Sequence, residues 1–256
     1  MSWTVFKHYL KRASRDPLGM FIFLVFPLVL VTIFVLINQN EAQQVFWVDG
    51  FDPVAMINTL ANIFLFALIG GTYSIDYIFS DFKSDRHFRL FSTPMSRTKF
   101  IFSMAVASSV IILVQLSVVL VVSYVAFNVY WGNWFIVVPT MFIVILMGQF
   151  IGIIVSYFIK KKGTAEAVMV GISWGVGILS GMLINVEIPV IGNFIANYFP
   201  IGAAINLSNL TSIFEFQTFL GITSGSSPAP VYALVLLGTT IALGVISFIF
   251  IKRKPL

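Results

Sequence analysis

Few side chains in this sequence are placed to carry out catalysis. The two histidines, His8 and His87, each lie among basic residues, without a second histidine or a cysteine nearby to complete a metal site. The chain has no cysteine, which excludes disulfides, thiolate metal ligands and cysteine nucleophiles. We therefore expect no catalytic residue, no metal site and no enzymatic activity in this chain.

Phosphate-binding patterns are also missing from the sequence. There is no Gly-Lys pair anywhere, so the chain cannot bind ATP through a P-loop. Gly175, Gly177 and Gly181 lack the dinucleotide-binding spacing and fall inside an apolar stretch. We expect no cofactor to be bound by this chain itself.

Six polar residues lie within apolar stretches, where polar groups are costly and often functional. They are Asn58, Asn62, Asp76, Gln115, Gln149 and Glu166. A proton relay needs acids near the middle of the membrane, whereas Asp76 and Glu166 lie near the ends of their stretches, within reach of water or lysine partners. This placement argues against a proton-coupled carrier.

The basic residues are confined to four short clusters. All fifteen Lys and Arg residues fall at residues 7–15, 83–99, 160–162 and 252–254. Short basic loops stay on the cytoplasmic side, so each of the three intervals between clusters predicts an excursion across the membrane and back. We predict a multi-pass plasma-membrane protein with both termini in the cytoplasm.

The composition agrees with a membrane location. The chain is 59% hydrophobic and 10% charged, whereas charged residues make up about a quarter of soluble domains. Topology and contact with anionic lipid headgroups account for the positive net charge, so we expect membrane lipid and no nucleic acid as a partner.

Six apolar segments are long enough to cross a bilayer, which takes roughly 20 helical residues. They are residues 18–37, 54–79, 100–129, 134–159, 167–186 and 231–251. We therefore predict an all-α membrane protein with six transmembrane helices in a single domain, residues 1–256.

Residues 1–16 are predicted to form an interfacial amphipathic helix, the alternative being a frayed basic N-terminus. Four apolar residues recur there at helical spacing and leave the basic residues in a stripe of their own. They are Trp3, Phe6, Leu10 and Ala13. Asp16-Pro17 then breaks the helix, which lets the chain turn from lying along the membrane to crossing it.

The segment between the last two spans, residues 187–230, is predicted to be re-entrant. Residues 188–210 are apolar but are interrupted by Pro189 and Pro200, and a further crossing would place the final basic cluster outside. Two short helices that dip into the outer leaflet satisfy their backbone better, and a Gly-Ser-Pro-rich loop follows them.

Small residues in the fifth span form two faces for close helix packing. They are Gly171-x-x-x-Gly175 and Gly177-x-x-x-Gly181. One interpretation is that these faces form a dimer contact. The alternative is that they have no special role, since glycine is frequent in membrane helices.

The second basic cluster contains the most specific pattern. Between Asp81 and Arg97, charged residues surround apolar ones, as in a short helix that docks in a groove of a partner protein. The alternative is a basic loop that lies on anionic lipid.

Two parts of the sequence resemble the ABC-2 type transporter permeases, the membrane subunits of ATP-driven exporters. Leu90-Phe-Ser-Thr-Pro94 followed by Ser96-Arg97 is similar to their Leu-Leu-x-Thr-Pro-x-x-Arg element. Residues 179–189 and Tyr198-Phe-Pro200 resemble their Ser-Gly-x-x-x-Pro and later proline elements. The order of these motifs and the six-span plan extend the resemblance over essentially the whole chain.

The sequence departs from the family pattern in two places. Asp85-Arg86 stands where the family often has Gly-Thr, and the first proline after Ser-Gly comes later than usual. The docking helix and the outer segment are therefore the features least constrained by the resemblance.

The resemblance implies partners and residue roles. Two copies of a separate P-loop ATPase, carrying ATP and Mg²⁺, would dock on the cytoplasmic coupling segment 80–99, and a second permease copy or a homologous permease would complete the membrane part. The residues expected to couple to the ATPase are Phe82, Asp85, Arg86, Phe88, Arg89, Leu90, Pro94 and Arg97. Those expected at an extracellular gate are Gly181, Glu187, Pro189 and Pro200.

The expected function is export of a hydrophobic or amphipathic substrate, and a drug, an antimicrobial peptide, a lipid and a glycolipid all stay open. The absence of a large outer domain favours a small prokaryotic exporter. The alternative is a secondary carrier, or a membrane-embedded binding or immunity protein, that needs no ATPase. A secondary carrier predicts paired charges near the middle of the membrane, which this sequence lacks.

Overall fold

The computed structural model describes residues 3–41, 53–83, 96–127, 129, 131, 133–179, 199–212 and 229–253, and every regular element in these ranges is a helix. In chain order the elements are α1 (Trp3–Ala13), α2 (Pro17–Met20), η1 (Phe21–Val25), α3 (Phe26–Glu41), α4 (Pro53–Ile69), α5 (Gly71–Tyr77), η3 (Ile78–Phe82), α7 (Arg97–Phe127), α8 (Trp134–Phe158), α9 (Lys162–Leu179), α11 (Pro200–Ser212) and α13 (Ala229–Arg253). The elements η1 and η3 are π-helical turns within longer helices.

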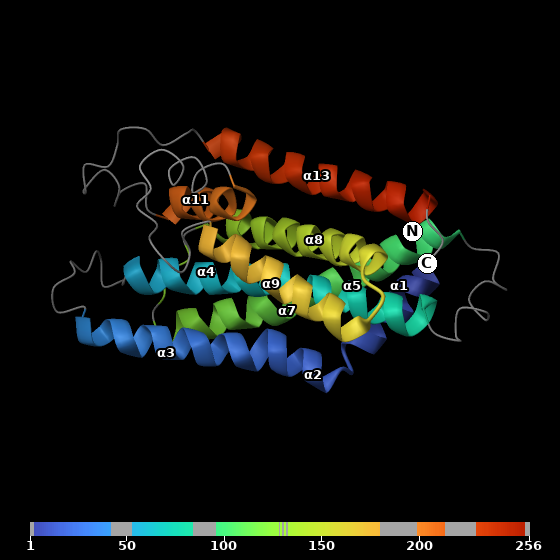
Figure 1. Ribbon diagram of the computed structural model, residues 1–256. Coiled ribbons are helices and arrows are strands. Elements are labelled where there is room, and N and C mark those ends of the chain that lie inside the picture. Colours follow the sequence, from blue (N-terminus) through green and yellow to red (C-terminus); the bar gives the residue numbers. More distant parts are fainter. Residues whose placement is uncertain are drawn as a thin grey trace.

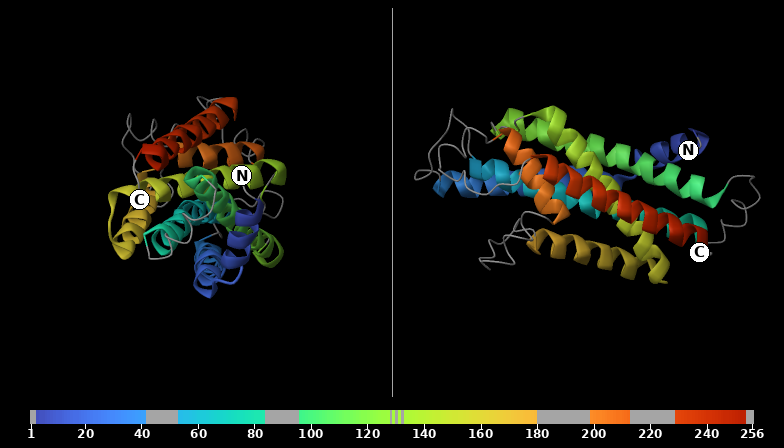
Figure 2. Two further views of the ribbon diagram at one scale, coloured as in Figure 1. Left: turned by 90° about the vertical axis from the view of Figure 1, so that its right-hand side faces the viewer. Right: turned by 90° about the horizontal axis from the view of Figure 1, so that it is seen from above.

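The long helices form one elongated bundle around α8 (Figure 1). Helix α8 contacts α4, α5, α7, α9, α11 and α13, and its buried residues form much of the core. Figure 2, which includes a view along the bundle, shows α13 at one edge and α3 at the opposite edge. Outward-facing Leu, Val, Ile and Phe side chains on α3, α7 and α13 are exposed, as expected for helices that contact lipid.

Within the described residues, four helices are long and apolar enough to cross a membrane. They comprise Thr59–Phe82, Arg97–Phe127, Trp134–Phe158 and Pro230–Arg253. A fifth candidate is the pair Trp3–Ala13 and Pro17–Ile33, which is bent by 69° at its break. The prediction of an all-α membrane protein is confirmed, with four or five candidate spans in the described part of the chain where six were predicted.

The fifth predicted span, residues 167–186, differs most from the structure. Helix α9 begins earlier, at Lys162, and is not among the four candidate spans. Its first turn is exposed and basic, and Lys162 there forms ion pairs with Asp76 and Glu166. Residues 180–186 lie outside the described residues.

The bend at the start of the first span has a local cause. Asp16 has an extended backbone and caps α2, where its Oδ1 accepts a hydrogen bond from the Leu18 N–H at 3.2 Å. Pro17 follows at the first helical position, where the missing N–H costs nothing. The predicted break at Asp16-Pro17 is confirmed.

The helix predicted at the N-terminus is present, and three of its four predicted apolar residues, Phe6, Leu10 and Ala13, pack against the bundle. Tyr9 and Ala13 are its buried residues, and Val5, Phe6 and Leu10 pack beside them. Trp3 is 60% exposed and stacks on Phe6 instead of entering the core.

Helix α8 crosses the break between α4 and α5 at a contact that admits only glycine. A Cβ atom on Gly71 would lie 2.2 Å from the Gly148 carbonyl oxygen, and one on Gly152 would lie 2.1 Å from the Gly71 carbonyl oxygen. The backbones therefore touch directly, which is the use of small residues in membrane helix packing. We name these three residues and Gly70 the glycine contact.

Gln149 hydrogen-bonds three helices together beside the glycine contact. Its Nε2 donates to the Gly70 carbonyl oxygen at 2.7 Å, and its Oε1 accepts from the hydroxyls of Ser74 at 2.5 Å and Ser108 at 3.1 Å. Because Gln149 is fully buried, this intramembrane polar residue has a structural role. Gln115 on α7 is buried with no hydrogen-bond partner for its amide among the described residues.

Candidate functional site

The basic clusters are joined by contacts at one end of the bundle. Arg12, from the first cluster, binds Asp81, which lies two residues before Lys83 of the second cluster. The Lys83 ammonium donates to the carbonyl oxygens of Ser156 at 2.5 Å and Ile159 at 3.0 Å, and Ile159 directly precedes the third cluster.

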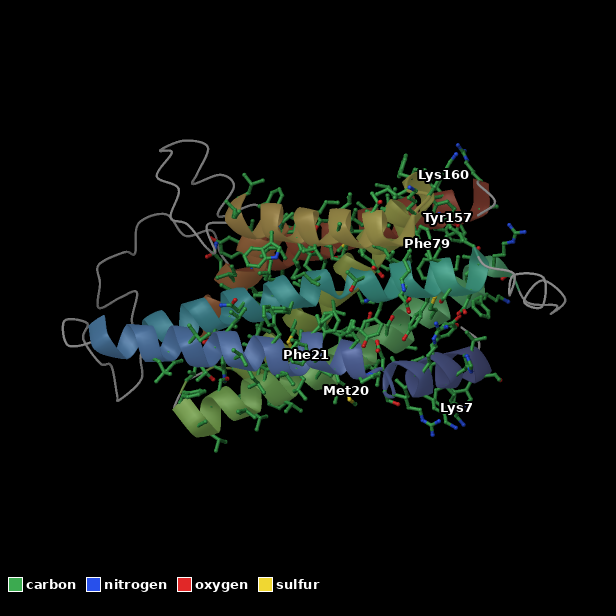
Figure 3. All side chains as sticks on the ribbon, turned by 60° about the horizontal axis from the view of Figure 1, so that its bottom comes forward. Lys7, Met20, Phe21, Phe79, Tyr157 and Lys160 are labelled. Carbon is green, nitrogen blue, oxygen red and sulfur yellow. The ribbon has the colours of Figure 1, made fainter. Side chains whose placement is uncertain are left out.

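The fourth cluster lies at the same end. Phe250, two residues before Lys252, packs against Phe158 with ring centroids 5.2 Å apart. Figure 3 shows Lys7 and Lys160 toward this end of the bundle. We call it the basic end, and it gathers described members of all four clusters, as the spacing of the basic residues predicted.

Helix α1 is bound to the end of the second span by an ionic cluster. The Arg12 Nη1 donates to both Asp81 carboxylate oxygens, at 2.8 and 3.0 Å, and its Nη2 donates to the Ser80 hydroxyl at 2.9 Å. The Tyr9 hydroxyl donates to Asp81 as well. We name Tyr9, Arg12, Ser80 and Asp81 the α1–η3 cluster.

The α1–η3 cluster is sheltered from water, which strengthens its interactions. Asp81 is only 7% exposed, and the Arg12 guanidinium also lies over the Tyr77 ring, 4.6 Å from its centroid. Burial, followed by the charge of Asp81, raises the pKa of Tyr9, so Tyr9 stays a protonated donor. Hydrogen bonds between a guanidinium and a carboxylate are among the strongest in proteins.

The two acids singled out in the apolar stretches are ion-paired at the basic end. Lys162 binds the Asp76 carboxylate, and its ammonium lies 3.6 Å from Glu166. The hydrogen bond to Asp76 raises the pKa of Lys162. The prediction that lysine partners lie within reach of these acids is confirmed. Both acids lie at the basic end, whereas a proton relay would need acids near the middle of the membrane.

Two of the residues expected to couple to an ATPase lie in the described part of the chain. Phe82 is buried and packs edge-on against Phe100, with ring centroids 5.2 Å apart. Arg97 is exposed at the start of α7. The end of η3 and the first turn of α7 are therefore in contact, so both ends of the intervening loop are anchored close together. The other six lie outside the described residues: Asp85, Arg86, Phe88, Arg89, Leu90 and Pro94.

The glycines of α9 face in different directions. In the described part of the chain, no atom of another helix lies within 4 Å of a Cβ built on Gly171 or Gly175, whereas Gly177 is buried in the same stripe as Met169 and Ser173. The first face is therefore open as far as the described residues extend, and Gly177 of the second face packs inward. Gly181 lies outside the described residues.

Of the residues expected at an outer gate, Pro200 alone lies in the described part of the chain. It is the first residue of α11, a helix that buries Ile201, Ala203 and Ala204 and packs on α4, α8 and α13. Gly181, Glu187 and Pro189 lie outside the described residues.

Tyr9 and its partner Asp81 were not predicted as a functional pair. The available signal was Asp81, an acid at the very end of an apolar stretch, together with an N-terminal helix whose Tyr9 and Ala13 are one turn apart. Nothing in a single sequence relates residues about 70 positions apart, as the 69-residue separation of Arg12 and Asp81 illustrates.

The comparison with known families agrees with this geometry. The family model described as ABC-2 type transporter matches residues 2–211, and the chain belongs to that family. It is thus a membrane permease with a role in transport, not itself an enzyme, and such proteins generally work with an ATP-binding partner. No curated protein sequence matches the chain.

Proposed function

We propose that this chain is the permease subunit of an exporter whose ATP is hydrolysed by a separate P-loop ATPase. The α1–η3 cluster is the observation that supports this most directly. It joins the N-terminal helix to the second span immediately before the loop expected to dock on the ATPase. A force on that loop would therefore move η3 and α1 together.

The start of the third span packs against both α1 and η3. The Phe100 ring contacts both Tyr9, at a centroid distance of 5.6 Å, and Phe82, at 5.2 Å. Closure of two ATPase copies around ATP and Mg²⁺ would then displace α1, η3 and the first turn of α7 as a block. The basic end would face the cytoplasm, where the ATPase is, with the chain in the plasma membrane of a prokaryotic cell.

Reversing two charges of the coupling segment tests the ATPase partner. We expect the double variant Arg89→Glu, Arg97→Glu to weaken ATPase binding at least tenfold, because charge reversal at an interface costs several kcal/mol. The measurement is co-purification of the ATPase in mild detergent, with substrate-stimulated ATP hydrolysis. Lys252→Glu with Arg253→Glu, exposed at the same end, is the matched control. Unchanged hydrolysis in the first double variant would show that the ATPase docks elsewhere.

We further propose that the open glycine face of α9 packs against a second permease copy. Leucine at Gly171 and Gly175 is expected to reduce the dimer fraction about tenfold while the unfolding temperature stays unchanged, because no described residue of another helix lies within 4 Å of a Cβ atom at either site. Leucine at Gly238, an equally open glycine on α13, is the control. Single-molecule photobleaching in bilayers measures the dimer, and an undiminished dimer in the α9 variant would rule out this face.

The proposed substrate is hydrophobic or amphipathic, in keeping with the apolar surfaces of the bundle. A drug, an antimicrobial peptide, a lipid or a glycolipid fits this description, and the proposed direction is outward.

A further inference from the structure

An open cavity of about 740 Å³ lies at the basic end, bounded by the bend between α1 and α2, by α5 and by α9. Its volume falls within the range of roughly 300–1,000 Å³ that is usual for small-molecule sites. It adjoins the α1–η3 cluster and shares Arg12 with it, whereas Tyr9, Ser80 and Asp81 do not line it. We call it the elbow cavity.

One part of the elbow cavity is apolar and lies beside a lipid-facing surface. Leu18, Ile22 and Phe23 line it from the first span, and Ile69 and Val170 line it from the other helices. Leu18 is 68% exposed, and its neighbours Met20 and Phe21 are also exposed on this side of the bundle (Figure 3). Hydrocarbon chains could extend from the cavity along this surface without leaving an apolar environment.

The remaining part of the cavity is lined by charges that balance. Arg12, Arg15 and Lys162 contribute three positive charges, and Asp16, Asp76 and Glu166 contribute three negative ones. A ligand with a single net charge would meet as much repulsion as attraction there. A headgroup that carries both charges matches the lining.

Among the cations of the cavity, Arg15 is the one available to a ligand. Arg12 binds Asp81 and Lys162 binds Asp76, whereas no acid lies within ion-pair distance of Arg15 in the described part of the chain. Its exposed side chain can therefore contact an anionic group at the mouth of the cavity.

A buried hydroxyl in the cavity wall points to a hydrogen-bond acceptor on the ligand. Tyr77 lines the cavity and is 2% exposed, yet its hydroxyl has no hydrogen-bond partner among the described residues. A buried hydroxyl without a partner is unfavourable, so an acceptor in the cavity would gain a strong contact once a small movement of the wall uncovers this hydroxyl. A phosphate oxygen is an acceptor of this kind.

We propose that the elbow cavity binds one zwitterionic phospholipid from the leaflet at the basic end. Its phosphate accepts a hydrogen bond from Tyr77 and pairs with Arg15, and its ammonium faces the carboxylates of Asp16 and Glu166. Its acyl chains follow the apolar wall out along the first span. The bound lipid would connect the bend at Asp16 to α9, and its binding requires neither ATP nor transport.

The test uses the purified full chain, stripped of lipid in detergent and titrated with dioctanoyl phosphatidylethanolamine by native mass spectrometry. We expect one lipid per chain. Tyr77→Phe and Arg15→Gln are each expected to weaken binding about tenfold, since each removes one contact to the phosphate. Tyr157→Phe, which removes a hydroxyl outside the cavity at the same end, is expected to bind like the unaltered chain.

A cavity-filling variant locates the lipid independently of the polar contacts. Val170→Trp is expected to abolish binding, whereas Val168→Trp, on the exposed side of the same helix, is expected to leave it unchanged. Thermal unfolding of each variant separates lost binding from lost folding. If both Val170→Trp and Arg15→Gln fold and bind the lipid normally, the elbow cavity is not the site.

Three competitors identify the source of the affinity. We expect dioctanoylglycerol, inorganic phosphate and a dodecyltrimethylammonium salt each to compete at least tenfold more weakly than the zwitterionic lipid. Equal competition by phosphate alone would make this a free-anion site, and equal competition by the cation would remove the role of Tyr77 and Arg15. Equal competition by the uncharged diglyceride would mean that the cavity binds acyl chains alone and does not recognise the headgroup. Each of these results overturns the proposal.

Discussion

Replacing Asp81 with alanine is expected to destabilise the protein by about 3 kcal/mol, because it leaves the Arg12 guanidinium and the Tyr9 hydroxyl without their shared partner in a sheltered position. It should also reduce the proposed ATP-driven transport more than it reduces the amount of folded protein, because α1 would no longer follow η3. Thermal unfolding in detergent measures the first effect. Transport in vesicles, normalised to folded protein, measures the second.

A double-mutant cycle separates the pair from its surroundings. The double variant Arg12→Gln, Asp81→Ala should lose clearly less free energy of unfolding than the two single variants lose together, since each single change already breaks the same contact. Lys11→Gln, an exposed cation on the same helix, is the matched control and should be nearly neutral. Additive costs in the cycle would mean that Arg12 and Asp81 do not stabilise each other.

Replacing Gly152 with alanine is expected to have the largest effect on stability. The new methyl group would lie 2.1 Å from the Gly71 carbonyl oxygen, which belongs to the backbone and cannot rotate away. Helix α8 must therefore move away from α5, and the Gln149 hydrogen bonds beside it must lengthen. Overpacking typically costs about 1–3 kcal/mol, and because this clash is with the backbone we expect a value of about 3 kcal/mol.

The same substitution at Gly238 provides the comparison. No described residue of another helix lies within 4 Å of a Cβ at that position on α13, so alanine there should be neutral or stabilise the helix by up to about 1 kcal/mol. Thermal unfolding of the two variants in the same detergent measures the difference. An unchanged unfolding temperature for Gly152→Ala would show that α5 and α8 do not make this close contact.

The features that could be predicted from the sequence depend on composition and on neighbouring residues. The membrane class follows from hydropathy, and the bend at Asp16-Pro17 follows from the lack of an N–H on proline together with the capping carboxylate. The gathering of the basic clusters at one end follows from their spacing. The lysine partners of Asp76 and Glu166 follow from their place near the ends of apolar stretches.

The glycine contact was not predicted, although part of its signal is present in the sequence. Gly148-x-x-x-Gly152 has the same spacing as the glycine pairs singled out in residues 171–181. The spacing alone cannot tell whether a small-residue face packs inside the chain, as at Gly148 and Gly152, or is open, as at Gly171 and Gly175. That distinction depends on which helices are neighbours.

The partners of the α1–η3 cluster could not be predicted for a related reason. The N-terminal helix was expected to be amphipathic, and hydropathy placed Trp3 on its apolar face. The structure buries Tyr9 instead, because Tyr9 can bring both a ring for packing and a hydroxyl for Asp81. A pattern of apolar residues does not distinguish a face that meets lipid from one that meets protein.

The glycine contact also has a mechanical consequence. Side chains between two helices normally absorb small movements by changing rotamer, but here backbone meets backbone and no rotatable bond separates Gly71 from Gly152. Asp81 lies ten residues further along, about 15 Å at the rise of a helix. A sideways displacement at Asp81 would therefore turn α5 about its contact with α8 and would not be absorbed by side chains between the two helices.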